Sequence, residues 1–316
     1  MRAMVIDGFG GADHLHPAEL PEPAAAAGEV LIRILAAGVN PVDWKIREGY
    51  LAAMFPHRFP LIPGWDAAGT VAALGVDVAD FAVGDRVWAY CRKPIVQGGT
   101  YAEFVVMTAR DVAAMPVHLD FEHAAAMPLV GLTSWQALFD AAGLIAGQSV
   151  LIHAGAGGIG SIAVQLAKNA GARVVATAGP QNRTYVRDLG ADHVVDYTAG
   201  DFVPAVRALF PEGVDVVFDT IGGETQTRSY QALRRNGCLI SIVDEPRLEE
   251  AGGFGVRAAF VFVSPNGNQL RKLAAMIDAG DIRPPAISVM PLSAAAEAQR
   301  LSQQGHVRGK IVLKVG

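Results

Sequence analysis

Three glycines in the middle of the chain have the spacing of a phosphate-binding turn. Gly155, Gly157 and Gly160 form a G-x-G-x-x-G pattern directly after the apolar run Val150–His153, and helical periodicity follows. In such a unit the first glycine permits a tight turn, the second lets a pyrophosphate approach, and the third lets helix and strand pack closely. The N-terminus of the following helix offers free N–H groups to phosphates. A turn without a ligand is the alternative, but the flanking strand and helix favour a dinucleotide site formed by Gly155, Ala156, Gly157, Gly158, Ile159 and Gly160.

The residues after the next predicted strand bear on the choice between NAD and NADP. An NAD site usually places an acid about 20 residues past the turn, where it binds the ribose 2′-hydroxyl. Residues 176–183 read ATAGPQNR, and the first acid after them is Asp188. Arg183 offers a cation with forked donors that suit a 2′-phosphate, although a solvated surface arginine is the simpler alternative. The missing acid and Arg183 together predict NADPH.

Strands and helices alternate in the part of the chain that carries this turn. Such alternation predicts βαβ units and a parallel sheet covered on both faces. Six strand candidates match the strand count of a Rossmann fold. They are Val150–His153, Val174–Thr177, His193–Val195, Val214–Asp219, Cys238–Val243 and Ala258–Val263.

The first part of the chain is β-rich and punctuated by glycine and proline. No long helical period separates its strand-like runs, so we expect an antiparallel, barrel-like domain. The runs are Val30–Ala36, Gly69–Leu74, Arg86–Tyr90 and Tyr101–Met107. The tail contains two helix-like stretches, Gln269–Ala279 and Ala294–Leu301, and a last strand, Gly309–Val315. The predicted class is therefore α/β, with one domain over 1–122 completed by 264–316, and a Rossmann domain over 123–263.

Composition is consistent with two domains and excludes some functions. A chain of 316 residues exceeds what one core usually serves. Its 51% hydrophobic and 18% charged residues suit a globular enzyme, and a net charge of -5 gives no general attraction to nucleic acid or anionic membranes. No apolar run approaches the roughly 18 residues of a membrane span, and Asp7 interrupts any signal-peptide core. We therefore expect a cytoplasmic protein.

Six motifs in a fixed order resemble the zinc-independent quinone oxidoreductase (zeta-crystallin-like) branch of the medium-chain dehydrogenases/reductases. They are GVNPVD at 38–43, PLIPGWDAAG at 60–69, VGDRV at 83–87, GGTYAE at 98–103, PLVGLTSW at 128–135 and GHVRGKIVL at 305–313. The resemblance implies a GroES-like β-barrel domain, a Rossmann domain, and an active site in the cleft between them. It also implies a homodimer in which Ala258–Val263 is an edge strand that pairs across a two-fold axis.

Residue roles carried over from the resemblance concern the cofactor first. Thr133 should face the cofactor, Tyr197 should contact the adenosine phosphate, and the segment after Asp219 should lie near the nicotinamide ribose. The cofactor positions outside the glycine-rich turn are Thr133, Thr177, Arg183, Tyr197, Thr220, Ile221, Phe262 and Val263. His153 is expected to be a packed, neutral histidine.

The same resemblance suggests where a substrate would bind and argues against zinc. Asn40 stands where zinc relatives usually carry a first cysteine ligand, and Trp65-Asp66 replaces a His-Glu pair; the only cysteines are Cys91 and Cys238. Without a Lewis acid, the reaction should favour acceptors that take hydride readily, namely quinones and α,β-unsaturated carbonyls. Candidate donors to the developing oxyanion are Asn40, Tyr50 and Lys45, and candidate cleft aromatics are Trp44 and Trp65.

Three functions remain open from the sequence. The favoured one is an NADPH-dependent quinone reductase, and an alkenal or enone reductase differs from it only in the acceptor. The rival from another class is an NADPH-binding protein without meaningful turnover, such as a sensor or a structural protein.

Overall fold

The first of the two units is built from three separate stretches of the chain. The computed structural model describes all residues, Met1–Gly316, and unit 1 comprises Met1–Leu129, Ser264–Gly280 and Pro284–Gly316. Unit 2 comprises Val130–Val263 and Asp281–Arg283. The boundary lies later than the expected 122/123, because helix α2 (Phe121–Ala125) packs on the sheet of unit 1. The short piece Asp281–Arg283 belongs to unit 2, where Gln165 hydrogen-bonds the backbone of Arg283.

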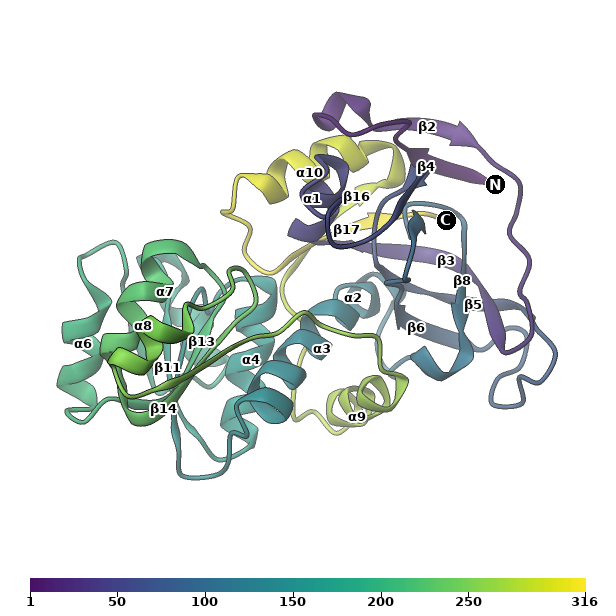
Figure 1. Ribbon diagram of the computed structural model, residues 1–316. Coiled ribbons are helices and arrows are strands. Elements are labelled where there is room, and N and C mark those ends of the chain that lie inside the picture. Colours follow the sequence, from purple (N-terminus) through teal and green to yellow (C-terminus); the bar gives the residue numbers. More distant parts are fainter. The chain divides into compact units, whose positions relative to one another are not determined.

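A seven-stranded sheet forms the framework of unit 1 (Figure 1). Its order is β16-β17-β3-β5-β6-β9, with β8 pairing on β3, and all pairs are antiparallel except β16 with β17. The long strand β3 is apolar and mostly buried, as a central strand must be. The bounds are β3 Glu29–Val39, β5 Asp66–Leu74, β6 Arg86–Tyr90, β8 Phe104–Thr108, β9 Val112–Ala114, β16 Ile287–Pro291 and β17 Lys310–Lys314.

Smaller elements complete unit 1. The remaining strands are β1 Arg2–Val5 with β2 His16–Glu19, and β4 His57–Ile62 with β7 Val96–Gly98. Besides α2, the helices are α1 Pro41–Arg47, α9 Gly267–Asp278 and α10 Ala295–Gln303, with short 3-10 turns at Ala12–His14, Ala109–Asp111 and Leu292–Ala294. The sequence predicted α9 and α10, as Gln269–Ala279 and Ala294–Leu301, but it predicted no helix in the first part of the chain, because α1 and α2 are too short for a visible apolar period. The N-terminus of α1 nevertheless has a local signal: Pro41 is its first residue, and Asp43 Oδ2 accepts the N–H of Asn40.

Unit 2 contains a six-stranded parallel sheet in the order β12-β11-β10-β13-β14-β15. This is the 3-2-1-4-5-6 order of a Rossmann sheet. The strands are β10 Ser149–Ile152, β11 Arg173–Thr177, β12 His193–Val195, β13 Val214–Asp219, β14 Leu233–Ser241 and β15 Arg257–Phe260. The helices are α3 Pro128–Trp135, α4 Gly158–Asn169, α5 Arg183–Asp188, α6 Phe202–Leu209, α7 Gly223–Ser229 and α8 Leu248–Gly253. A π-helix covers Gln136–Ala141, and 3-10 turns cover Pro180–Asn182 and Tyr230–Ala232.

Two strands of unit 2 differ from the predicted ranges by more than one residue at an end. β14 begins at Leu233 instead of Cys238, because Leu233 pairs with Val214 and a bulge then carries the polar run Arg234–Asn236. β15 ends at Phe260, so Phe262 and Val263 follow the strand instead of belonging to it.

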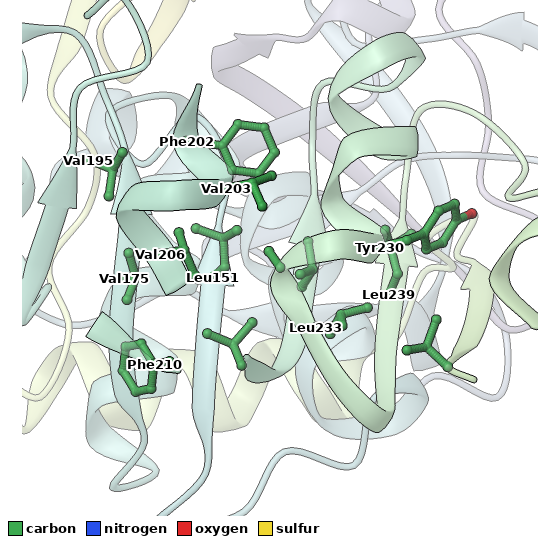
Figure 2. Packing of buried hydrophobic residues seen from close by; sticks show 14 of the residues in the cluster. Leu151, Val175, Val195, Phe202, Val203, Val206, Phe210, Tyr230, Leu233 and Leu239 are labelled. Carbon is green, nitrogen blue, oxygen red and sulfur yellow. The ribbon is translucent and has the colours of Figure 1, made fainter. Parts of the chain in front are cut away.

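Apolar side chains from the strands and from α6 form the core on one face of this sheet (Figure 2). Leu151, Val175 and Leu239 come from the strands. Val206 lies in α6, and Phe210 directly follows that helix. Val206 and the three strand residues are fully buried. A side chain of this kind contributes about 1.5–3 kcal/mol when it is completely buried. This core holds the carboxyl ends of the strands, where the candidate site lies, in a fixed register.

Candidate functional site

The glycine-rich turn connects β10 to α4. The N-cap of α4 is Gly157, and the first helical hydrogen bond runs from Ser161 N to Gly157 O at 2.9 Å. The N–H groups of Gly158, Ile159 and Gly160 therefore have no partner within the helix. They lie at the positive end of a helix of 12 residues. Such a helix start suits a pyrophosphate.

The tight turn depends on Ala154, not on the first glycine as the sequence suggested. Ala154 has a φ of 49°, and its carbonyl accepts the N–H of Gly157 at 2.9 Å. Gly155 is needed instead for close packing, because a Cβ there would lie 2.8 Å from the Cβ of Ala176. At Gly160 a Cβ would lie 2.1 Å from Ala154 O, so α4 packs directly on the turn. At Gly157 a Cβ would lie 3.3 Å from Ala154 O, a tight contact that a shift of a few tenths of an ångström would relieve.

The hydroxyl of Thr177, at the end of β11, faces this turn from inside the protein. Thr177 Oγ1 accepts the N–H of Ala154 at 3.1 Å and lies 3.2 Å from His153 Nδ1. His153 Nε2 lies 2.9 Å from Ser229 Oγ. Burial lowers the pKa of His153 to about 4, so the ring is neutral at physiological pH, as the sequence suggested. Thr177 is thus beside the turn, but its hydroxyl is already engaged.

The buried carboxylate of Asp219 shapes the loop after β13. Asp219 accepts the backbone N–H groups of Ile221 at 3.0 Å and Gly222 at 2.9 Å, and it also binds Ser241 Oγ and Gln226 Nε2. Thr220 Oγ1 donates to the carbonyl of His153 at 2.9 Å, which holds the loop against the glycine-rich turn. Ile221 is half exposed. The structure therefore brings Thr220 and Ile221 next to the turn.

Thr133, on α3, has a buried hydroxyl without a hydrogen-bond partner. The next residue, Ser134, contacts the carbonyls of Val130 at 2.7 Å and Ile159 at 3.2 Å, which places the end of α3 beside the start of α4. Buried hydroxyls are nearly always paired in proteins. An orphaned hydroxyl near the phosphate turn fits a ligand that supplies the missing partner.

The remaining cofactor candidates lie near the two outer strands of the unit 2 sheet, β12 and β15. Arg183 is exposed at the start of α5, and Tyr197 is exposed after β12. Hydrogen bonds from Thr198, and with them the charge of Arg183, lower the pKa of Asp196. At the other edge, Val261 N donates to Ser241 O at 2.9 Å, so Phe262 and Val263 follow the carboxyl end of β15, beside the carboxyl end of β14.

Asn40, a candidate substrate donor, is buried in unit 1. Its Nδ2 donates to Asp66 Oδ2 at 2.9 Å, and its Oδ1 accepts from Lys310 Nζ. Lys310 Nζ also lies 3.4 Å from Asp66 Oδ2. Asp66 Oδ1 accepts the N–H of Leu129 at 2.7 Å. The amide of Asn40 is thus engaged inside the unit by Asp66 and Lys310, and its role as a donor to the substrate stays a prediction.

A second buried carboxylate lies beside this group. Asp43 Oδ2 accepts the N–H of Asn40 at 2.8 Å and the hydroxyl of Tyr101 at 2.9 Å, whereas Asp43 Oδ1 has no partner. Burial raises the pKa of Asp43 to about 7, and burial also raises the pKa of Asp66. Asp43 and Lys310 were not among the candidates that the sequence suggested. Their only signal was a charged residue next to apolar ones: Asp43 follows Pro41-Val42, and Lys310 precedes the apolar run Ile311–Leu313.

Of the aromatic candidates, Trp44 lies with Tyr50 and Lys45, and Trp65 lies in the core. Tyr50 is 67% exposed, and its ring is edge-on to Trp44 at 5.8 Å. Lys45 Nζ lies 5.7 Å from the centre of the Trp44 ring. Trp65 is buried against Tyr90, at 5.9 Å between ring centres, so it is not part of an exposed surface in unit 1.

The cysteines and histidines are dispersed. Cys91 and Cys238 are both free and buried, and burial raises the pKa of each thiol. No three His, Cys, Asp or Glu side chains group together as metal ligands would.

The longest helices have 12 residues, and no helix meets the length and hydropathy that a membrane span requires.

Fold and site together define a two-domain dinucleotide-binding protein. Family comparisons agree: residues 26–117 match the alcohol dehydrogenase GroES-like domain, and residues 189–313 match the zinc-binding dehydrogenase domain. The chain belongs to the medium-chain dehydrogenase/reductase superfamily, in its quinone oxidoreductase branch.

Individual relatives support this membership over nearly the whole chain. The zebrafish (Danio rerio) mitochondrial NAD(P)H oxidoreductase RTN4IP1 is 35% identical, covering 100% of this chain and 91% of its own. An Arabidopsis thaliana chloroplast envelope quinone oxidoreductase homolog is 33% identical, covering 99% and 98%. An Arabidopsis chloroplastic NADPH-dependent alkenal/one oxidoreductase is 32% identical, covering 99% and 79%.

Solved structures give the same result. The quinone oxidoreductase of Coxiella burnetii superposes with a TM-score of 0.89 at 34% identity, covering 100% of this chain and 99% of that one. The Escherichia coli quinone oxidoreductase complexed with NADPH has a TM-score of 0.89 at 27% identity and covers 100% of both chains. The predicted fold class, a GroES-like barrel with a Rossmann sheet, is confirmed.

Proposed function

We propose that this chain is an NADPH-dependent, zinc-independent reductase that delivers hydride to quinones. The observation that carries the proposal is the anion-binding turn, in which the N–H groups of Gly158–Gly160 lack helical partners and Thr133 Oγ1 is buried and unpaired. These residues would hold the pyrophosphate and a neighbouring cofactor group. Arg183 would bind the 2′-phosphate, since no acid follows β11. NADPH, when bound, supplies the hydride.

The side chains at the positions of zinc ligands support chemistry without a metal. Asn40 and Asp66 are both engaged by the ammonium group of Lys310, which supplies the positive charge there. An acceptor must then take hydride without Lewis-acid help, as quinones do. The exposed hydroxyl of Tyr50, with Lys45 and Trp44 beside it, is the available donor group on unit 1 and is proposed to face the acceptor.

A second acceptor class is an α,β-unsaturated carbonyl. Hydride addition to its β-carbon leaves an enolate that needs the same kind of donor as a reduced quinone. The similarity of this chain to an alkenal/one oxidoreductase supports this second class of acceptor.

We also propose a cytosolic homodimer. Strand β15 lies at the edge of the unit 2 sheet and pairs only with β14, so its outer side is free to pair with a second copy. Two free cysteines fit a reducing compartment such as the cytosol.

A direct assay tests the function. Purified protein, dialysed against a chelator, is given NADPH or NADH with a panel of quinones and small alkenals, and nucleotide oxidation is followed. We expect turnover with NADPH and a quinone, and a higher kcat/KM for quinones than for alkenals. A preference for alkenals would select the second acceptor class. Loss of activity on chelation that zinc restores would contradict the zinc-independent reaction, and binding of NADPH without turnover would favour a sensor or structural role.

A further inference from the structure

His153 contacts four elements at the carboxyl end of β10, where the glycine-rich turn begins. The residue follows β10 directly, and its side chain is 1% exposed. Its ring reaches Thr177 at the end of β11 and Ser229 at the end of α7. The ring also packs edge-on against Phe202, the first residue of α6, at 4.8 Å between centres.

The donors and acceptors around this ring fix its tautomer. Ser229 Oγ donates its single hydrogen to the carbonyl of Thr225 at 2.6 Å, so it must accept from His153 Nε2. On the other side, Thr177 Oγ1 accepts the N–H of Ala154 and has its own hydrogen left to donate to His153 Nδ1. His153 is therefore the neutral Nε2–H form. Burial lowers its pKa to about 4, which agrees with this form, and Asp219 is the charged group that opposes the shift.

The residue at the end of this hydrogen-bond chain has a strained backbone. Ala154 has a φ of 49°, in the left-handed region that a Cβ disfavours. Its N–H is bound by Thr177 Oγ1, and its carbonyl is bound by Gly157 N. The same carbonyl lies against Gly160, the third glycine of the turn. A residue in such a conformation persists only when its surroundings hold it there.

We propose that His153 is a positioning residue for the cofactor: through Thr177 it holds Ala154 in the left-handed conformation, and thereby sets the glycine-rich turn for the pyrophosphate. The inference rests on the proposed NADPH function. The backbone of His153 acts on the same place from the other side, because its carbonyl accepts the hydroxyl of Thr220. One buried histidine thus fixes both loops that the cofactor is proposed to contact.

Matched variants separate this role from simple packing. Thr177→Val removes the hydroxyl at constant shape, whereas Thr177→Ser keeps it. His153→Asn places an amide oxygen near the Nδ1 position, and His153→Gln places an amide nitrogen near the Nε2 position. We expect Thr177→Val to bind NADPH roughly tenfold more weakly than Thr177→Ser, a factor equal to about 1.4 kcal/mol. His153→Gln should lose more affinity than His153→Asn, because only the asparagine can accept from Thr177.

A rescue variant tests the strained residue itself. Glycine adopts a positive φ without the Cβ penalty. Ala154→Gly, added to Thr177→Val, should therefore recover part of the lost NADPH affinity. The KM for the electron acceptor should stay the same throughout the series, since the acceptor does not use this turn.

Several results would overturn the proposal. Equal NADPH dissociation constants for folded Thr177→Val and Thr177→Ser would show that the Thr177 hydroxyl does not position the turn. A lack of recovery with Ala154→Gly would show that backbone strain at Ala154 does not affect NADPH binding. If the wild-type chain binds neither nicotinamide nucleotide, the proposed function fails instead. The positioning role is then still decided by imidazole nitrogen NMR, where an Nδ1–H tautomer contradicts it, and by hydrogen exchange at Ala154, which Thr177→Val must accelerate.

Discussion

Lys310 and Asp66 form an ion pair that is closed to solvent, with 3.4 Å between Lys310 Nζ and Asp66 Oδ2. Their side chains are 4% and 0% exposed, and Asn40 connects them by donating to Asp66 and accepting from Lys310. The two residues stand 244 positions apart in the chain. Since Lys310 belongs to β17 and Asp66 to β5, the pair ties the C-terminal strand to the first part of unit 1.

Replacing Lys310 by methionine should destabilise the protein strongly. The variant leaves the carboxylate of Asp66 buried without its cation, a change that typically costs about 3–5 kcal/mol. Urea denaturation at neutral pH measures the loss. The double variant Lys310→Met/Asp66→Asn should be destabilised by less than the sum of the two single changes, and strict additivity would show that the pair is not coupled.

Asp43→Asn should flatten the pH dependence of stability. Burial raises the pKa of Asp43 from 3.8 to about 7, so the folded protein binds this proton more tightly than the unfolded chain does. The free energy of unfolding should therefore fall as the pH rises from about 4 to about 7, by an amount on the order of 3 kcal/mol. Denaturation curves across that range test this, with the exposed Asp80→Asn as a control that keeps the wild-type slope. An unchanged slope in Asp43→Asn would rule out Asp43 as its source.

Two glycines of the turn should respond differently to alanine. A Cβ at Gly160 would lie 2.1 Å from Ala154 O, so Gly160→Ala should lose both stability and NADPH binding. Gly157 has a φ of -75°, and a Cβ there would lie 3.3 Å from Ala154 O, so Gly157→Ala should fold with a shift of only a few tenths of an ångström in the turn. The added methyl group would nevertheless stand where a pyrophosphate must approach. Thermal unfolding and NADPH titration of both variants measure the difference, and normal NADPH affinity in Gly157→Ala would place the phosphates elsewhere.

Arg183→Ala should weaken NADPH binding by about 1–3 kcal/mol and leave NADH binding nearly unchanged. The physical reason is that only NADPH carries the 2′-phosphate that this guanidinium is proposed to bind. Arg187, one turn further along α5, is the matched control. Calorimetric titration with both nucleotides gives the comparison, and an equal loss for both would contradict the 2′-phosphate role.

A proline in β15 should separate the proposed dimer. Val261 N bonds to Ser241 in β14, and N–H groups alternate along a strand, so the N–H of Ala258 faces the free edge. A monomer tolerates proline at such a position, whereas a sheet continued by a second copy does not. We expect Ala258→Pro to shift the molecular mass in light scattering to that of one chain. A wild-type monomer, or a dimer that survives the proline, would exclude pairing through β15.

The sequence predicted those parts of the fold in which glycine-rich or polar turns follow clearly periodic apolar segments. The turn from β10 to α4 and the six parallel strands could be predicted, because each strand is an apolar run followed by a recognisable turn. Helix α1 and the start of β14 could not, since one has only 7 residues and the other contains a polar run. The contacts of Asn40 and Thr177 could not be predicted from the sequence either. Their partners, Lys310 and His153, are 270 and 24 residues away in the chain, and only the folded backbone brings each pair together.

The position of β17 between β16 and β3 affects how the chain folds during synthesis. Unit 2 is almost continuous over Val130–Val263, so its sheet can form while later residues are still being translated. Residues Ala36–Val39 of strand β3, although made early, lack a neighbour on one side until Lys310–Lys314 leave the ribosome, whereas Glu29–Arg33 pair with β8 on that side. A short apolar stretch of strand edge is therefore open until β17 has been made, which exposes it to wrong pairing during synthesis.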